Sequence, residues 1–196
     1  MGQQRLIVVD IMDTLLHDPW REALEAATGL TSDELNARRN MAVWRALECD
    51  KVTEAAYWRN MQDNGISVDP AVFHSVRTRG YRWLAGAREL LEELAATQHH
   101  VALGTNYPRW VDDVARLFRS YKLPLYASCD LGVRKPSTAY FAHILGDHDL
   151  SHDALVLIDD TEANAAAVTE LGGTGIVHES APKTRQQLTK LGVFDG

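Results

Sequence analysis

Five short apolar runs, separated by segments with helical periodicity, set the strongest limit on how this chain folds. The runs are Leu6–Val9, Val101–Gly104, Leu125–Ser128, Ala154–Ile158 and Gly175–Val177. Runs of this length without alternating polar residues are typical of strands that are buried on both faces. Strands that alternate with helices form a parallel sheet covered by helices on both sides. The sequence therefore predicts a doubly wound, Rossmann-like α/β fold.

The alternation stops between His17 and Leu84, where only helical patterns occur. Because this block directly follows the first strand, we expect it to form a helical cap over that strand's carboxyl end. The predicted domains are a core of residues 1–16 and 85–196 and a cap of residues 17–84. Within the cap, Thr31 begins a sequence with the spacing of a capping box, and helices are predicted over Pro19–Thr28, Thr31–Glu48, Thr53–Gln62 and Asp69–Arg79.

The composition argues against several classes of function. The chain has 196 residues and a formal net charge of −7, which disfavours a general nucleic-acid binder. Cys49 and Cys129 are too few for a disulfide framework, and free thiols are typical of the cytoplasm. No apolar stretch approaches the roughly 18 residues that a membrane span needs. We expect a cytoplasmic protein that acts on a small molecule and binds neither nucleic acid nor membrane, while its oligomeric state stays open.

Polar side chains follow four of the predicted strands, where ligands bind in an open parallel sheet. They are Asp10 to Thr14 after the first strand, Thr105 and Asn106 after the second, Lys135 beyond the third, and Asp159 and Asp160 after the fourth. A carboxylate can attack phosphorus and form an aspartyl intermediate. Lys135 supplies a cation and Thr105 a hydroxyl donor for phosphoryl oxygens. Asp10, Asp159 and Asp160 are suitable ligands for Mg²⁺. The set predicts a phosphoryl-transfer site, with Thr14, Asn106 and Lys135 as further substrate-binding candidates.

In this order, the four segments resemble the four motifs of the haloacid dehalogenase (HAD) superfamily, and the resemblance covers essentially the whole chain. The helical block at 17–84 resembles the C1 cap of that superfamily. The resemblance implies that Asp10 is the nucleophile, that Thr105 binds phosphate and that Lys135 orients both. It also implies a Mg²⁺ site at Asp159 and Asp160.

Met12 departs from the HAD phosphatase pattern, in which an aspartate at this position transfers a proton. Methionine cannot do so, although its backbone carbonyl can still bind Mg²⁺. Asp13 is one candidate to take over the proton transfer. Two other interpretations stay open: a dehalogenase- or phosphonatase-type reaction that needs no acid there, and a protein that binds a phosphorylated ligand or a protein partner without turnover. The Asp159-Asp160 pair favours phosphorus chemistry, since dehalogenases usually have a motif adapted to a metal-free site.

Three groups of residues in the predicted cap each have two interpretations. Lys51 either forms a Schiff base, as in phosphonatases, or is a solvated lysine in a turn. The arginines either recognise an anionic substrate or cover solvated helix faces, and the tryptophans either line a pocket or pack between cap and core. These residues are Arg38, Arg39, Arg45, Arg59, Arg77, Arg79 and Arg82, and Trp20, Trp44, Trp58 and Trp83. The predicted function is Mg²⁺-dependent hydrolysis of a small phosphorylated metabolite through Asp10.

Overall fold

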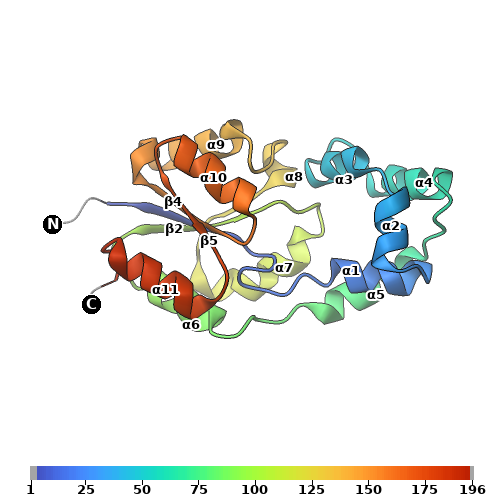
Figure 1. Ribbon diagram of the computed structural model, residues 1–196, viewed down its shortest axis with the longest axis horizontal. Helices are drawn as coiled ribbons and strands as arrows, with labels where there is room; N and C mark the ends of the chain where they lie inside the picture. Colours follow the sequence, from blue (N-terminus) through green and yellow to red (C-terminus); the bar gives the residue numbers. More distant parts are fainter. Residues whose placement is uncertain (1–3, 195–196) are drawn as a thin grey trace.

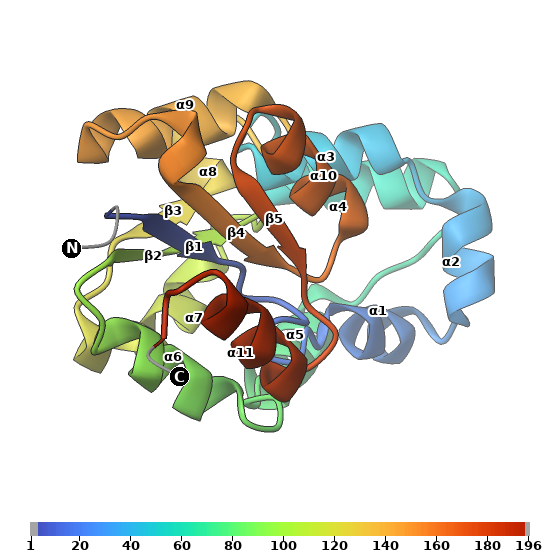
Figure 2. The same ribbon diagram turned by 60° about the vertical axis from the view of Figure 1, so that its left-hand side comes forward.

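A five-stranded, all-parallel sheet forms the centre of the computed structural model, which describes residues 4–194 (Figures 1 and 2). Its strands are β1 (Leu6–Val9), β2 (His100–Thr105), β3 (Leu125–Ala127), β4 (Leu155–Asp159) and β5 (Thr174–Val177). Their order in the sheet is β3-β2-β1-β4-β5, so β1 lies between β2 and β4. The predicted doubly wound fold is confirmed, and the strands that precede the polar segments are neighbours.

Alternate residues of each strand pack against different helical layers, as the strand period of two requires. Ile7 and Val9 of β1 face the layer of α6 (Ala87–Ala95), α7 (Val111–Phe118) and α11 (Ala181–Lys190). Leu6 and Val8 face the opposite layer, whose main helices are α9 (Thr138–His148) and α10 (Glu162–Glu170). The short helix α8 (Ser128–Leu131) follows β3, and 3₁₀ turns η1 and η2 occupy Arg119–Tyr121 and His152–Ala154. Both faces of the sheet are therefore buried.

Five helices lie between β1 and α6, at the end of the molecule farthest from the termini (Figure 1). We call this segment the helical insertion. It contains α1 (Trp20–Thr28), α2 (Ser32–Arg38), α3 (Met41–Glu48), α4 (Glu54–Asp63) and α5 (Pro70–Gly80). Thr31 forms the predicted capping box with Glu34 at the start of α2. Among residues 4–194, no helix is both long and apolar enough to cross a bilayer.

The prediction of one helix over Thr31–Glu48 is wrong. Arg39 is extended, with φ −70° and ψ 144°, and ends α2. The Asn40 side chain then accepts a hydrogen bond from the Ala42 amide at 3.0 Å and begins α3. The N-cap preference of asparagine is stronger here than the helical pattern across residues 38–41.

The helical insertion is joined to the sheet by two segments that run side by side. Leu16 and Trp83 form an antiparallel bridge between them. The His17 amide donates to the Arg82 carbonyl and the Leu84 amide to the Leu15 carbonyl, each at 2.9 Å. The chain thus enters and leaves the insertion at one place.

An aromatic cluster fills the interior of the helical insertion and extends to the core. Trp110, which precedes α7, lies with its ring centroid 4.9 Å from that of Phe73, 6.0 Å from Trp44 and 6.1 Å from Trp58. Its indole nitrogen donates to Glu54 at 2.8 Å. Trp20 also packs on Trp44, with centroids 5.0 Å apart. These contacts support the packing interpretation of the tryptophans.

Candidate active site

The Lys135 ammonium lies at the centre of the polar groups that follow the strands. Its Nζ donates to Asp10 Oδ1 at 2.7 Å, to Asp159 Oδ2 at 2.6 Å and to the Gly104 carbonyl at 2.8 Å. The side chain is 1% exposed, and both carboxylates are buried. An ammonium has three donors, so each donor has an acceptor. One buried cation thus joins the carboxyl ends of β1, β2 and β4.

Asp10 and Thr14 form a compact turn beyond β1. The Asp10 amide donates to the Ile158 carbonyl at 2.8 Å, which continues the pairing between β1 and β4. The Thr14 hydroxyl lies 3.4 Å from Asp10 Oδ2 and accepts from the Asp160 amide at 3.1 Å. Thr14 is fully buried and does not line the cavity described below. It therefore positions the two carboxylate segments, and its predicted contact with substrate stays a prediction.

Asp159 and Asp160 follow β4 and differ in their surroundings. Asp159 Oδ1 accepts from the Thr161 amide and from the Asn164 side chain, both at 2.9 Å. Asp160 is exposed at the site. One oxygen each of Asp10, Asp159 and Asp160 lie within 4.8 Å of one another. A cluster of three carboxylates beside solvent provides the hard oxygen ligands that Mg²⁺ prefers, with positions left for water.

Thr105 and Asn106 follow β2 and have different partners. The Asn106 side chain donates to the Lys135 carbonyl at 3.0 Å and accepts from the Lys135 amide at 2.8 Å, so it fixes the Lys135 backbone. The Thr105 hydroxyl is buried, and among residues 4–194 it has no hydrogen-bond partner. A buried hydroxyl without a partner is costly, and a phosphoryl oxygen bound in this site would satisfy it.

The electrostatics of the site reflect burial opposed by neighbouring charge. Burial raises the pKa of Asp10 to about 8, and the Lys135 ammonium opposes that increase. Burial alone would lower the pKa of Lys135, but the charges of Asp10 and Asp159 raise it. Partial desolvation at the edge of the cavity and the Asp159 charge raise the pKa of Asp160 to about 6. A divalent cation among these carboxylates would favour their ionised forms.

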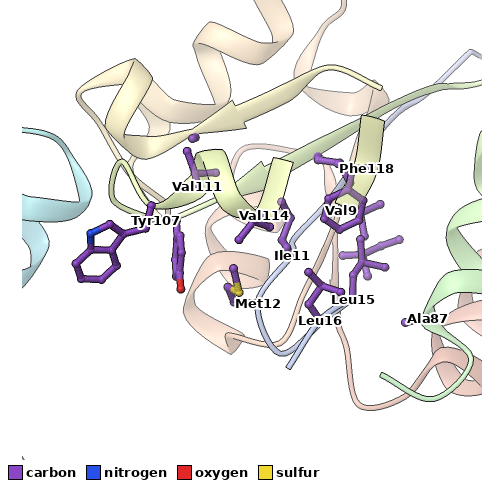
Figure 3. Packing of buried hydrophobic residues seen from close by; sticks show 14 of the residues in the cluster. Val9, Ile11, Met12, Leu15, Leu16, Ala87, Tyr107, Val111, Val114 and Phe118 are labelled. Atoms are coloured by element: carbon purple, nitrogen blue, oxygen red, sulfur yellow. The ribbon is translucent and has the colours of Figure 1, made fainter. Parts of the chain in front are cut away.

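Met12 packs with apolar side chains rather than presenting a polar group. It belongs to the buried cluster that includes Ile11, Leu15 and Tyr107 (Figure 3). Asp13 has a left-handed backbone, with φ 55°, and its exposed carboxylate accepts from the Asp18 amide at 3.1 Å. The structure thus brings Asp13 to the site, where its carboxylate accepts a hydrogen bond from the backbone of Asp18.

Asp18 is a carboxylate at the site that the sequence analysis did not select. It accepts hydrogen bonds from the Trp20 amide at 3.1 Å and from the Tyr107 hydroxyl at 3.4 Å. Burial raises its pKa to about 6. Only its place next to Pro19, at the start of the helical insertion, distinguishes it in the sequence, and that pattern indicates a turn rather than a catalytic group.

A cavity of about 550 Å³ lies between the sheet edge and the helical insertion. Asp10, Thr105, Asn106, Lys135, Asp159 and Asp160 line it together with Met12, Asp13 and Asp18. Arg45, Glu48 and Arg134 also line it. Arg45 is one of the arginines for which the sequence analysis left substrate recognition open, whereas Glu48 and Arg134 were not selected. No motif identifies them because α3 and the segment after α8 are brought together only by folding. Lys51 lines an adjacent groove and not this cavity, and none of the four cap tryptophans lines it.

Comparisons with known proteins agree with the fold. No protein-family profile matches the chain. It is 28% identical over 191 residues to flavin mononucleotide hydrolase 1 of Arabidopsis thaliana, a chloroplast protein, covering 96% of this chain and 78% of that protein.

Among solved structures, the chain is similar to a predicted HAD-like hydrolase from Porphyromonas gingivalis, with a TM-score of 0.76, 19% identity, and coverage of 99% and 100% of the two chains. A HAD family enzyme from Bacteroides thetaiotaomicron in complex with magnesium and inorganic phosphate has a TM-score of 0.66 at 16% identity, covering 88% of this chain and 92% of that one. A 2-haloacid dehalogenase from Pseudomonas syringae has a TM-score of 0.67 at 18% identity, covering 96% and 100%.

The parallel sheet and these similarities confirm the predicted resemblance to the HAD superfamily. The chain therefore has the fold of HAD-like hydrolases, and it is similar in sequence to a flavin mononucleotide hydrolase.

Proposed function

We propose that this protein hydrolyses a small phosphate monoester with Asp10 as nucleophile and Mg²⁺ as cofactor. The observation that carries the proposal is that the buried Lys135 ammonium contacts both Asp10, at 2.7 Å, and Asp159, at 2.6 Å. The Thr105 hydroxyl lines the same cavity and has no hydrogen-bond partner within residues 4–194. Three phosphoryl oxygens need cations and donors around them, and this edge of the sheet supplies both. The flavin mononucleotide hydrolase relative supports a phosphate ester as substrate.

The chemistry divides into two steps at Asp10. Its carboxylate attacks phosphorus, the bond from phosphorus to the ester oxygen breaks, and an aspartyl-phosphate forms while the leaving alcohol takes a proton. Water then attacks the same phosphorus, which releases inorganic phosphate and restores the carboxylate. Lys135 and Thr105 stabilise negative charge on the phosphoryl oxygens in both steps. Mg²⁺, when bound, neutralises phosphoryl charge that clustered carboxylates would otherwise repel, and Asp10, Asp159, Asp160 and the Met12 carbonyl would hold it.

Proton transfer to the leaving alcohol cannot come from Met12. We propose that a carboxyl group elsewhere in the cavity supplies it, and Asp13 and Asp18, which both line the cavity, are the candidates. Asp13 is one residue from the usual position. Asp18 has a pKa raised to about 6 by burial, which suits a general acid near neutral pH.

We also propose that the helical insertion acts as a cap, with domain limits at residues 17–84, and that it excludes bulk water from the cavity. Arg45 and Glu48 of α3 line the cavity opposite the sheet edge, which supports this role. Cys49 and Cys129 are both free, which supports a reducing compartment such as the cytoplasm.

The test is phosphate release from a panel of phosphate esters with Mg²⁺, by the wild type and by Asp10→Asn and Met12→Asp variants. We expect wild-type turnover that requires Mg²⁺ and that Asp10→Asn abolishes. Turnover by Met12→Asp alone would instead indicate a protein that binds phosphorylated ligands without turning them over. No turnover in any variant, together with no Mg²⁺-dependent binding of a phosphate mimic, would refute the phosphoryl site. Halide release from a 2-haloacid without metal would favour the dehalogenase alternative.

A further inference from the structure

A second hollow adjoins the cavity that contains Asp10. It is a groove of about 380 Å³ between α3 and the segment that follows α8. Arg45 and Arg134 line both hollows, so the groove and the cavity lie next to each other at these two side chains. Lys51, Cys49, Val133 and Ser137 also line the groove. Figure 1 shows α3 and α8 facing each other at this junction of the helical insertion and the core.

The charged residues that line the groove are all positive. Arg45, Lys51 and Arg134 line it, and none of its lining residues is acidic. Glu48 offsets one of these charges, because its Oε2 lies 2.7 Å from Arg134 Nε. That contact pairs one guanidinium with one carboxylate. Two cations therefore remain in excess.

The nearest other acid does not neutralise Lys51. Asp50 is next to it in the chain, but its carboxylate accepts two hydrogen bonds from Arg109, at 2.8 and 3.1 Å. Within residues 4–194, no ion pair engages the side chain of Arg45 or of Lys51. Unpaired cations that converge on a groove attract anions by direct charge and by hydrogen bonding.

The other end of the cavity would repel a second anionic group. Asp13, Asp18 and Asp160 line it near the nucleophile, and Lys135 is already shared by two carboxylates. An aromatic leaving group also lacks a partner, since no aromatic residue is among those that line the cavity or the groove. The rings of the helical insertion pack on one another instead.

Building on the proposed phosphatase activity, we propose that the groove formed by Arg45, Lys51 and Arg134 is a second anion subsite. The substrate class is a small, polar phosphate ester whose leaving group carries a second anionic group, either a phosphate or a carboxylate. The reacting phosphate binds at Thr105 and Lys135, and the second anion binds in the groove. An ester with an uncharged aromatic leaving group, such as flavin mononucleotide, uses only the first of these sites.

The test compares matched esters in the presence of Mg²⁺. The pairs are fructose 1,6-bisphosphate with fructose 6-phosphate, and 3-phosphoglycerate with glycerol 3-phosphate, with flavin mononucleotide as an aromatic reference. We expect kcat/KM to be at least about tenfold higher for the doubly anionic member of one pair, which corresponds to about 1.4 kcal/mol. The pair that responds distinguishes a phosphate from a carboxylate in the groove. A preference for flavin mononucleotide over every doubly anionic ester would overturn the proposal.

The variants Lys51→Ala and Lys51→Glu test the groove itself, and Arg59→Ala is the matched control. Arg59 is an exposed cation of the same helical insertion that lines neither hollow. We expect the Lys51 variants to lower the selectivity for the doubly anionic ester about tenfold, mainly through KM, and Arg59→Ala to leave it unchanged. Equal loss for both members of a pair would contradict the subsite.

A binding measurement separates this proposal from the proposed function. In the Asp10→Asn background, calorimetry with Mg²⁺ measures Kd for fructose 1,6-bisphosphate and fructose 6-phosphate without turnover. Tighter binding of the bisphosphate, lost on adding Lys51→Glu, supports the subsite even if no ester is hydrolysed. Turnover by the wild type with equal Kd values for both esters, and likewise for the carboxylate pair, leaves the hydrolase intact and rejects the subsite.

Discussion

Replacing Lys135 by methionine tests whether its ammonium holds the sheet edge together. Lys135→Met keeps an unbranched side chain, one atom shorter, but removes the cation that lies 2.7 Å from Asp10 and 2.6 Å from Asp159. Both carboxylates are buried, at 6% and 0% exposed, so water from the cavity compensates only part of the lost charge pairing. Breaking a buried ion pair from one side costs about 3–5 kcal/mol. We expect a loss of that size in the free energy of unfolding.

The measurement is urea and thermal unfolding, followed by circular dichroism, with EDTA present so that no divalent cation replaces the ammonium. For a chain of this size, 1 kcal/mol corresponds to about 2–4 °C in Tm, so Tm should fall by roughly 6–20 °C. The exposed Lys190→Met is the control, because Lys190 forms none of the ion pairs found in residues 4–194. It should change the free energy of unfolding by less than about 0.5 kcal/mol.

A second substitution distinguishes lost charge pairing from lost packing. At a pH above the raised pKa of Asp10, adding Asp10→Asn to Lys135→Met removes one of the two uncompensated charges, so we expect the double variant to regain about 1–2 kcal/mol. If Lys135→Met costs less than about 1 kcal/mol, or if Asp10→Asn brings no recovery, the charge-based reasoning is wrong.

Three further predictions concern proton transfer and packing. Met12→Asp should raise kcat by about 10²-fold or more if the missing acid limits turnover, measured as phosphate release, while lower thermal stability is expected because Met12 is buried. If Asp18 is the general acid, its protonated form is required, so wild-type kcat should fall as pH rises through its pKa of about 6. Asp18→Asn should remove this limb of the pH profile, whereas an unchanged limb would exclude Asp18 as its origin. Gly175→Ala should destabilise by about 1–3 kcal/mol in urea unfolding, because its Cβ would lie 1.9 Å from the Ala165 carbonyl oxygen; the control Gly146→Ala in α9 meets nothing within 4 Å and should be neutral or stabilising.

The strands and the polar groups after them were predictable because each depends on local sequence. A buried parallel strand has a continuous apolar run, such as Leu6–Val9, and the residue after it points to the edge where ligands bind. Asp10, Thr105, Lys135, Asp159 and Asp160 therefore meet in one cavity, as their positions after the strands indicated.

The remaining site residues depend on contacts between distant segments. Arg45 and Glu48 face Arg134 only because α3 packs beside the segment after α8. The periodicity of the sequence does not predict that contact. The arginine-rich sequence of the predicted cap did not decide whether these side chains recognise an anionic substrate or cover solvated helix faces. The structure places these arginines in different surroundings. Arg45 lines the cavity, whereas Arg77 is buried in an ion pair with Asp113 at 2.8 Å.

The contact between Trp110 and the rings of the helical insertion gives the protein an optical reporter. Trp110 precedes a core helix, whereas Trp44 and Trp58 belong to the insertion, and their rings lie about 6 Å apart. Movement of the insertion away from the sheet would separate these indoles and place Trp110 in water. The emission of the unmodified protein should then shift to longer wavelength as the two parts separate and return as they close. Stopped-flow fluorescence would therefore time opening and closure without any attached dye.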